Sequence, residues 1–323
     1  MREHSSGGVR TKMVRSRFAP SPTGLLHAGS AWAALASWAF AKQRGGTWIL
    51  RVEDIDTPRI RAGSLESILD DLRFLGLAWD EGPGVGGIYA PYTQSERTAL
   101  YEDALRELTR LGLVYPCDCS RKEIQAASEA SAPHGAETRY PGTCRDKSPQ
   151  RSFRRLPALR LRVPRDASVS FVDGVFGAQT ENVSEAASDF VLQRGDGLFA
   201  YQLVVAIDDR AMRITDVVRG ADLLPSTARQ ILLMQLLGAT EVPQYTHVAL
   251  VVGEAGERLA KREQLATMAS LRERGWSAER LLGVLGHGLG LVESDAPCTL
   301  DEIAARAPTP MRGETWVLPP AMV

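Results

Sequence analysis

The stretch FAPSPTGLLHAGSAW, residues 18–32, joins an apolar strand to an apolar helix and decides the fold. We predict a short strand over residues 17–20 and a helix over residues 27–44, in which apolar side chains recur at helical spacing. Gly24 and Gly29 allow the backbone of the connection to approach a ligand closely. A strand, a tight loop and a helix in this order predict the first unit of an α/β sheet.

His27 stands at the predicted start of that helix. The unpaired N–H groups and the dipole at a helix N-terminus favour a bound anion. In an open α/β sheet, ligands bind outside the carboxyl ends of the strands, and the first strand-to-helix turn faces that crevice. The stretch therefore predicts a phosphate site.

The same alternation continues along the chain. Ser64 and Ser95 are predicted to cap two helices, and PSTARQILLMQLLG is predicted to form another. Further strands are expected in the apolar segments TWILRVEDID, YQLVVAIDD, ITDVVRG and HVALVVG. Strands that alternate with helices predict an α/β fold with a doubly wound parallel sheet of the Rossmann type.

Changes in this pattern suggest the domain borders. Residues 1–14 read as a disordered tail, and residues 15–265 as the main domain. Between about residues 114 and 200, cysteines, a polar stretch and short strand-like pieces such as VSFVDGVFG predict an insertion. Residues 266–323 are expected to form a helical C-terminal segment.

Composition limits the class of protein. The chain has 323 residues, of which 44% are hydrophobic and 24% charged, as expected for a globular protein with a sizeable core. Its net charge of −1 argues against a basic protein that coats nucleic acid. Because it has neither a run of roughly 18 apolar residues nor a secretory signal, we expect a cytoplasmic protein without a membrane partner.

Five ordered segments carry a resemblance to a known family. RFAPSPTGLLHAGS, RVEDID, GLFAYQL, VVRGAD and ERLAKRE follow one another in the order and rough spacing of class I glutamyl-tRNA synthetases. The resemblance covers residues 17–262. It implies a class I catalytic domain over residues 15–265 that uses ATP with Mg²⁺ to activate glutamate.

The resemblance implies an ATP site made by two motifs. For the first motif, HAGS, it implies that His27, Gly29 and Ser30 bind the phosphates of ATP. In the second, the lysine loop ERLAKRE, only Lys261 keeps its chemical type, since Arg258 and Ala260 stand where the family has lysine and serine. Cations over the phosphates stabilise the charge that develops as pyrophosphate leaves, so His27 and Lys261 are the expected catalytic residues.

A selective glutamate pocket needs two cations for the carboxylates and one anion for the ammonium group. Arg17 and Arg219 can supply the cations, and the sequence leaves open which carboxylate each would bind. The resemblance implies that Glu53 binds the ammonium group. It also implies that Ala19, Ser21 and the hydroxyl of Tyr201 line the pocket.

The cysteines of the insertion predict a metal site. In a cytosolic chain, cysteines are more often thiols or metal ligands than disulfides. Cys117, Cys119 and Cys144 supply three thiolates, whereas a closed structural zinc site takes four ligands. The resemblance nominates Tyr140 as the fourth ligand, and His134 is the conventional alternative. We expect one structural zinc ion that holds the insertion together.

The stretch CRDKSPQRSFRRLPALRLRVPR, residues 144–165, is rich in cations. Such a stretch either contacts the phosphates of tRNA or forms a solvated loop.

Within the family, the chain most resembles a shortened subfamily that lacks anticodon-binding domains. Those relatives attach glutamate to the queuosine base in the anticodon loop of tRNA(Asp). We therefore expect a monomer whose partners are ATP, L-glutamate and tRNA(Asp) bearing queuosine. The alternatives are a glutamyl- or glutaminyl-tRNA synthetase catalytic domain that charges the tRNA 3′ end, and an inert tRNA- or nucleotide-binding module. A nucleotidyltransferase would share the histidine turn but leave Glu53 and the paired arginines unexplained.

Overall fold

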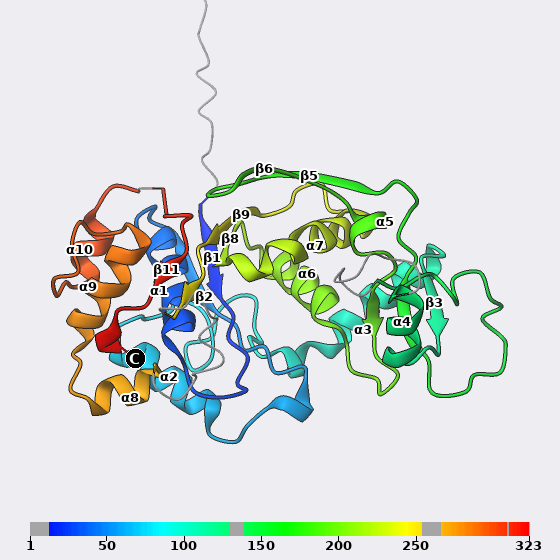
Figure 1. Cartoon of the computed structure of the whole chain (residues 1–323), viewed down its shortest axis with the longest axis horizontal. Coiled ribbons are helices and arrows are strands. Elements are labelled where there is room, and N and C mark those ends of the chain that lie inside the picture. The colour runs from blue at the N-terminus through cyan, green and yellow to red at the C-terminus, as the bar shows by residue number, and fades with distance from the viewer. Residues whose placement is uncertain (1–12, 130–138, 254–265, 309, 323) are drawn as a thin grey trace, which may run out of the picture.

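The computed structural model (Figure 1) describes residues 13–129, 139–253, 266–308 and 310–322. Their centre is a six-stranded sheet of strand order β2-β1-β8-β9-β5-β6. The strands are β1 (Arg15–Phe18), β2 (Thr47–Leu50), β5 (Ser168–Asp173), β6 (Gly177–Asn182), β8 (Asp216–Gly220) and β9 (Gln244–Val248). Every neighbouring pair is parallel except the β5–β6 hairpin. The predicted α/β fold with a mostly parallel sheet is confirmed.

Helices cover both faces of this sheet. Side chains of the strands alternate between two cores, so that Trp48 of β2 packs on one face and Ile49 on the other. The first core includes α1 (Ala28–Lys42), α2 (Ser64–Phe74) and the C-terminal helices, and the second includes α3 (Thr98–Arg110), α6 (Tyr201–Ala211) and α7 (Leu224–Leu236). This arrangement is the doubly wound fold that the alternation of strands and helices predicted.

The segment YQLVVAIDD is a helix, α6, and the predicted strand was wrong. Leu203 to Asp209 are all buried, so the apolar run shows neither a strand nor a helix period. A short continuous apolar run cannot be assigned by periodicity alone. Its neighbours decide the outcome, because α6 packs against both α7 and α3.

Two predicted helix caps were also wrong. Ser64 is the first residue of α2, and Gly63 with a φ of 77° precedes it. Ser95 lies in a 3-10 turn (Gln94–Arg97) before α3. Its N–H and hydroxyl both donate to Asp54, at 2.8 and 2.6 Å. Ser95 therefore ties the loop after β2 to this turn and does not cap α3.

The segment from residue 114 to 200 contributes to two sheets. The strands β3 (Val114–Cys117), β4 (Ala158–Leu161) and β7 (Val191–Gln193) form a separate three-stranded antiparallel sheet. This sheet and helix α4 (Arg121–Glu129) lie at the end of the molecule opposite the C-terminal helices (Figure 1). The hairpin β5–β6 instead extends the central sheet beyond β9. The short helix α5 (Val183–Ala186) follows β6 and packs against this hairpin.

The C-terminal part packs on the first core. It contains α8 (Met268–Glu273), α9 (Ala278–Leu289), α10 (Leu300–Ala305) and the short strand β11 (Trp316–Val317), which pairs with β10 (Val251–Val252). Trp316 stacks on Trp32 of α1 with ring centroids 4.7 Å apart. Short 3-10 turns cover residues Thr57–Arg59, Ala221–Leu223 and Pro320–Met322. Within the described ranges, no helix is long and apolar enough to cross a membrane.

Candidate active site

The loops that follow β1 and β2 meet at the carboxyl edge of the sheet. The N–H of Glu53 donates to the carbonyl of Pro20 at 2.9 Å, and the N–H of Arg61 donates to that of Pro22 at 3.1 Å. Ala19 and Ser21 lie in the first of these loops, half-buried and exposed respectively. The two loops are thereby held together at the edge where ligands of open α/β sheets bind.

His27 is the N-cap of α1, as the sequence predicted. Its Nδ1 accepts from the N–H of Ser30 at 3.3 Å, and its Nε2 lies 3.1 Å from the Ser30 hydroxyl. Gly29 leaves room for the imidazole, because a Cβ built there would lie 3.2 Å from His27 Nδ1. The three residues expected to hold phosphate are therefore together at one helix N-terminus.

Lys261, together with Arg258 and Arg262, lies outside the described residues. The chain that follows it is fixed beside the histidine turn. The N–H of Ala28 donates to the carbonyl of Ala266 at 2.9 Å, and the N–H of Met268 donates to that of Leu26 at 2.8 Å. Residues 266 and 268, which follow the lysine segment, thus lie next to the predicted phosphate site.

Arg17 is buried at the end of β1 and is not a free cation. Its Nε and Nη2 donate to the two carboxylate oxygens of Asp209 at 3.0 and 3.3 Å. Burial alone would raise the pKa of Asp209, but the positive charges of Arg17 and Arg51 outweigh burial and lower it to about 2. Nη1 of Arg17 has no acceptor among the described residues, so it remains available to a ligand.

Glu53 is held by Arg51, which is completely buried. Arg51 donates from Nη2 to Glu53 Oε1 at 2.9 Å and from Nη1 to Asp209 Oδ1 at 2.6 Å. Burial raises the pKa of Glu53 in spite of the opposing charges of Arg51 and Arg17. Its second oxygen has no donor within the described part of the chain, and Glu53 lines a cavity.

Sequence reasoning missed the buried acids that orient these residues. Asp208 accepts from Arg97 Nε at 2.6 Å and from the hydroxyl of Tyr101 at 2.9 Å. Asp209 joins Arg17 and Arg51, as described above. The available signal was a pair of acids at the end of an apolar run, but that run had been predicted as a strand, which would place them on opposite faces.

Arg219 ends β8 and is 4% exposed. In contrast to Arg17, it has no carboxylate in ion-pair contact anywhere in the described ranges. Neutral acceptors hold its guanidinium group, so its positive charge is not cancelled by a direct partner.

Tyr201 brings the predicted glutamate residues into one site. It begins α6 and lines the cavity with Glu53. Burial raises the pKa of its phenol, and the charges of Arg219, Glu53, Arg17 and Asp209 all act on it. Both predicted arginines and the predicted carboxylate are therefore near Tyr201, together with Asp209, which pairs with Arg17.

A cavity of about 870 Å³ begins at this site. Ser21, Glu53 and Tyr201 line one side, and Cys119 and Arg121 of the insertion line another. The cavity therefore connects the glutamate residues with the cysteine cluster, and it is large enough for a nucleobase with a side chain.

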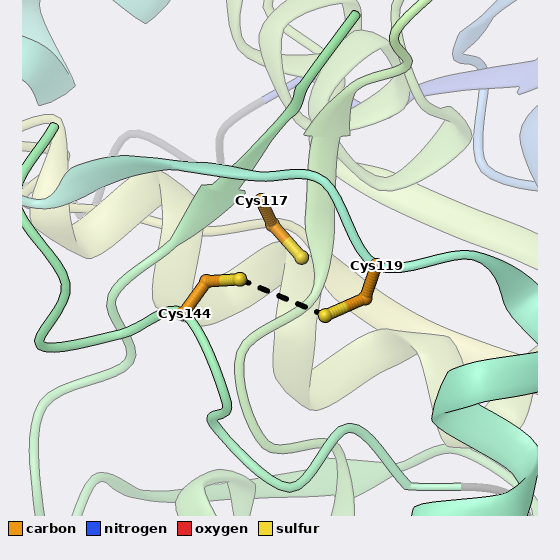
Figure 2. A group of neighbouring side chains, drawn as sticks. All are labelled: Cys117, Cys119 and Cys144. Atoms are coloured by element: carbon orange, nitrogen blue, oxygen red, sulfur yellow. Dashed lines mark hydrogen bonds between the residues drawn. The ribbon is translucent and has the colours of Figure 1, made fainter. Parts of the chain in front are cut away.

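The three cysteines converge, with their Sγ atoms within 4.8 Å of one another. Figure 2 shows the three thiols pointing toward a common centre. The Sγ atom of Cys119 lies 3.6 Å from the Sγ atom of Cys144. The Tyr140 hydroxyl lies 3.3 Å from Cys117 Sγ and accepts from the Cys144 N–H at 2.8 Å. The phenol oxygen is therefore beside the thiols, and the set fits a metal ion. His134 lies outside the described residues.

Nearby side chains adjust the ionisation of these thiols. Burial opposes ionisation of Cys117, but hydrogen bonding to Tyr140 and Arg160 outweighs it and lowers the pKa of that thiol. Burial and the neighbouring thiols raise the pKa of Cys119 to about 12. The donors beside Cys117 favour its thiolate, which is the form that binds metal. Arg151 Nη2 donates to Cys144 Sγ at 3.3 Å.

The cation-rich stretch makes ion pairs within its own module. Arg151 and Arg154 both contact Asp118, at 2.6 and 3.4 Å, and Arg154 also contacts Glu123. Arg145 pairs with Asp189 and donates to the carbonyl of Val163. Part of the charge of the stretch is therefore used to hold the insertion together, while residues 146–150 and 154–156 are exposed.

Comparisons with known proteins agree with this geometry. The family described as "tRNA synthetases class I (E and Q), catalytic domain" matches residues 13–306. A glutamyl-Q tRNA(Asp) synthetase of Nitratidesulfovibrio vulgaris is 47% identical over 290 residues, which are 88% of this chain and 89% of that protein. The glutamyl-Q tRNA(Asp) synthetase of Symbiobacterium thermophilum is 46% identical over 90% of this chain and 91% of its own.

Among solved structures, a glutamate-tRNA synthetase from Elizabethkingia anophelis superposes with a TM-score of 0.80 at 28% sequence identity. The superposition covers 96% of this chain but 69% of that longer one. The fold and the site thus have relatives among enzymes that handle glutamate and tRNA.

Proposed function

The chain belongs to the class I glutamyl- and glutaminyl-tRNA synthetase family, and we propose from this premise that it is a ligase that glutamylates the queuosine base of tRNA(Asp). In the first step, a carboxylate oxygen of L-glutamate attacks the α-phosphorus of ATP, and pyrophosphate leaves. In the second, a hydroxyl of the queuosine side chain attacks the activated carbonyl, and AMP leaves. Neither step needs a covalent enzyme intermediate, so positioning and charge stabilisation supply the catalysis.

One observation supports glutamate as the substrate above the others. The charges of Arg17, Arg219, Glu53 and Asp209 all act on the phenol of Tyr201. Asp209 already accepts from Arg17 and Arg51, so the two arginines and Glu53 are the charged groups left to match the two carboxylates and the ammonium group of glutamate. Glutamine would present a neutral amide to one arginine, so this charge pattern favours glutamate.

The ATP phosphates are assigned to the N-terminus of α1. His27, Gly29 and Ser30 would contact them there, and Lys261 would add a cation, since Ala266, which follows it in the sequence, lies beside Ala28. Mg²⁺ accompanies ATP as part of the substrate. Loss of one such preorganised cation typically costs about 3 to 4 kcal/mol in the barrier.

We assign the cysteine cluster to one structural zinc ion. Cys117, Cys119 and Cys144 would supply thiolates and Tyr140 a phenol oxygen, which completes a set of four ligands. The zinc ion would stabilise the insertion. It would take no part in either chemical step, for which the residues at the sheet edge would be responsible.

The acceptor is assigned from the relatives that the chain resembles and from the cavity. The chain is 47% and 46% identical to the two glutamyl-Q relatives, and 28% identical to the glutamate-tRNA synthetase of known structure. The cavity that begins at Glu53 and Tyr201 offers space for a modified base.

We further propose that the enzyme acts as a monomer in the cytoplasm. All of the proposed site residues come from one chain, and ATP, glutamate and tRNA are available together in that compartment. Analytical ultracentrifugation with and without tRNA measures the oligomeric state.

Two assays test the proposed function. Glutamate-dependent ATP–pyrophosphate exchange tests activation, with glutamine and aspartate as controls. Transfer of labelled glutamate is then measured on tRNA(Asp) with queuosine, on tRNA(Asp) without it, and on queuosine-bearing tRNA(Asp) that lacks the terminal adenosine. Labelling that requires queuosine and survives removal of the adenosine supports the proposal. Labelling that ignores queuosine but requires the adenosine shows charging of the 3′ end, and absence of exchange overturns the enzyme assignment.

A further inference from the structure

Three neighbouring strands place an acid, a histidine and an arginine in one buried row. Arg219 of β8 and His247 of β9 occupy paired register positions, and Asp173 ends β5 on the other side of β9. Asp173 is 2%, His247 0% and Arg219 4% exposed. The proposed reaction assigns no role to Asp173 or His247, although buried ionisable groups are costly to retain.

The guanidinium of Arg219 is held entirely by neutral acceptors. Its Nε donates to His247 Nε2 at 3.0 Å, Nη1 to Gln230 Oε1 at 2.8 Å, and Nη2 to the Thr227 hydroxyl at 2.8 Å. Nη2 also donates to the carbonyl of Leu223 at 3.3 Å. These contacts fix the plane of the guanidinium without cancelling its charge.

The contact with Arg219 decides the protonation of His247. Arginine carries only donors, so Nε2 of His247 must accept, and the ring proton must be on Nδ1. Nδ1 lies 2.6 Å from Asp173 Oδ2 and donates to it. Burial lowers the pKa of His247, and the charge of Arg219 lowers it further against the opposing effect of Asp173, which is consistent with a neutral ring.

Asp173 is itself fixed by the backbone. Its Oδ1 accepts from the N–H groups of Val175 and Phe176, both at 3.0 Å, and its Oδ2 accepts from the N–H of His247 at 3.2 Å. Burial would raise the pKa of Asp173, but hydrogen bonds from His247 and these N–H groups lower it overall. The carboxylate is therefore ionised and presents Oδ2 to the imidazole in one orientation.

We propose that Asp173 and His247 are positioning residues that hold Arg219 in the orientation that binds a carboxylate of glutamate. The proposal rests on the proposed function, because it assigns Arg219 to that substrate. Asp173 fixes the Nδ1–H form of the ring, and this form leaves Nε2 as an acceptor for Arg219. The acid is not in contact with the guanidinium, so Arg219 is oriented without losing its charge to a direct ion pair.

Two substitutions of His247 separate its contact with Arg219 from its contact with Asp173. Gln at position 247 can place an oxygen where Nε2 lies, which keeps an acceptor for Arg219. Asn at the same position can place a polar atom only near Nδ1, which keeps the contact with Asp173 but not that with Arg219. We expect His247→Asn to raise the KM for glutamate by about tenfold or more, and His247→Gln to raise it by less than about threefold. The KM for ATP should stay close to that of the unchanged chain in both.

A third substitution reverses the ring proton. In Asp173→Asn, the amide oxygen is kept by the N–H groups of Val175 and Phe176, so the amide nitrogen faces His247 Nδ1. That nitrogen is a donor, which forces the ring proton onto Nε2 and removes the acceptor from Arg219. The expected result is again an increase in the KM for glutamate without one for ATP. His287→Asn, at a half-buried histidine on α9, is the matched control.

The experiment combines exchange kinetics with ¹⁵N NMR of the histidine rings. Kinetics are measured below the melting temperature of each variant, so loss of fold is separated from loss of glutamate binding. NMR of the unchanged chain should show His247 neutral and protonated on Nδ1, and this result needs no variant to fold. A ring protonated on Nε2, or glutamate KM values equal in the Gln and Asn variants, would overturn the proposal. Lack of exchange in the unchanged chain would instead overturn the proposed function, and the positioning role with it.

Discussion

At the scale of single residues, the site is organised by ion pairs that sequence reasoning did not foresee. Arg17 was expected to be a cation waiting for substrate, but it is paired with Asp209 through two hydrogen bonds. Asp209 also accepts from Arg51, which in turn holds Glu53. Removing one partner of such a buried group leaves an unpaired charge, so these residues support one another in addition to the role proposed for them in binding glutamate.

Asp209→Asn tests this interpretation. The substitution leaves Arg17 and Arg51 buried without their shared carboxylate, which should lower the free energy of unfolding by about 3 to 5 kcal/mol at neutral pH. The pKa of Asp209 is about 2 in the fold, below the value of about 3.9 for an unfolded chain. Its contribution is therefore present above pH 4 and lost as the pH falls from about 4 to 2. The variant should lose less stability than the unchanged chain over that interval.

Urea unfolding at pH 7, 4 and 2.5 measures both effects. Asp70→Asn is the matched control, because Asp70 forms an exposed ion pair with Arg73 and should change stability by less than about 1 kcal/mol. Equal urea midpoints for the Asp209 and Asp70 variants would contradict a buried network that depends on Asp209.

At the scale of elements, the sequence predicts a segment well where its period or its neighbours leave one choice. The segment ITDVVRG was predicted as a strand and forms β8, and PSTARQILLMQLLG was predicted as a helix and forms α7. YQLVVAIDD has a similar apolar content but forms α6. Its hydrophobic run has no period, so packing against distant helices determined the outcome, and packing is not encoded locally.

The residues of the candidate site also fall into those that the sequence could predict and those that it could not. Motif order named His27, Glu53, Tyr201 and Arg219, and the structure places them at the N-terminus of α1, on the cavity wall and near the end of β8. It could not predict that Asp209 would meet Arg17, because those residues are 192 positions apart and meet only after the sheet is assembled. Spacing predicts residues that share a loop, whereas partners from different elements depend on the tertiary fold.

The N-terminus of α1 offers a test in which stability and function should separate. Gly29→Ala adds a residue with higher helix propensity, worth up to about 1 kcal/mol. The new Cβ would, however, lie 3.2 Å from His27 Nδ1 and 3.3 Å from Cε1, so the imidazole must move. We expect an unchanged or higher melting temperature together with an increase in the KM for ATP of about 5- to 100-fold.

Gly24→Ala is the comparison for that substitution. A Cβ at Gly24 meets no atom of the chain nearer than Arg61 Nη1 at 4.0 Å, so the melting temperature should stay close to that of the unchanged chain and His27 should keep its place. A rise in the KM for ATP in this variant would report the approach of the ligand to Gly24, not a movement of His27. If Gly29→Ala leaves the KM for ATP unaltered in pyrophosphate exchange, His27 does not contact the phosphates.

At the scale of the whole molecule, two large cores and one very small one support different tasks. Both large cores pack on the central sheet and hold the histidine turn and the glutamate residues in place. The third cluster has only four buried members among the described residues, which are Tyr115, Cys117, Tyr140 and Cys144. The strands β4 and β7 bury Leu161 and Leu192 in the second core. It is therefore the cysteine end of the module that lacks apolar support, and arginine ion pairs and a metal ion would stabilise that end.

The same module lines one side of the cavity, and this position predicts which step depends on the metal ion. Cys144→Ser should lower the zinc content below one per chain and reduce glutamyl transfer to tRNA by about tenfold or more, because Cys119 and Arg121 lose their fixed place in the cavity wall. Pyrophosphate exchange should change by less than about twofold, since the module supplies no proposed contact to ATP or glutamate. Zinc analysis and both assays with excess Mg²⁺ test this, with Cys298→Ser, outside the cluster, as the control. Equal losses of exchange and transfer in Cys144→Ser would show that the metal ion stabilises the whole enzyme and not the acceptor side alone.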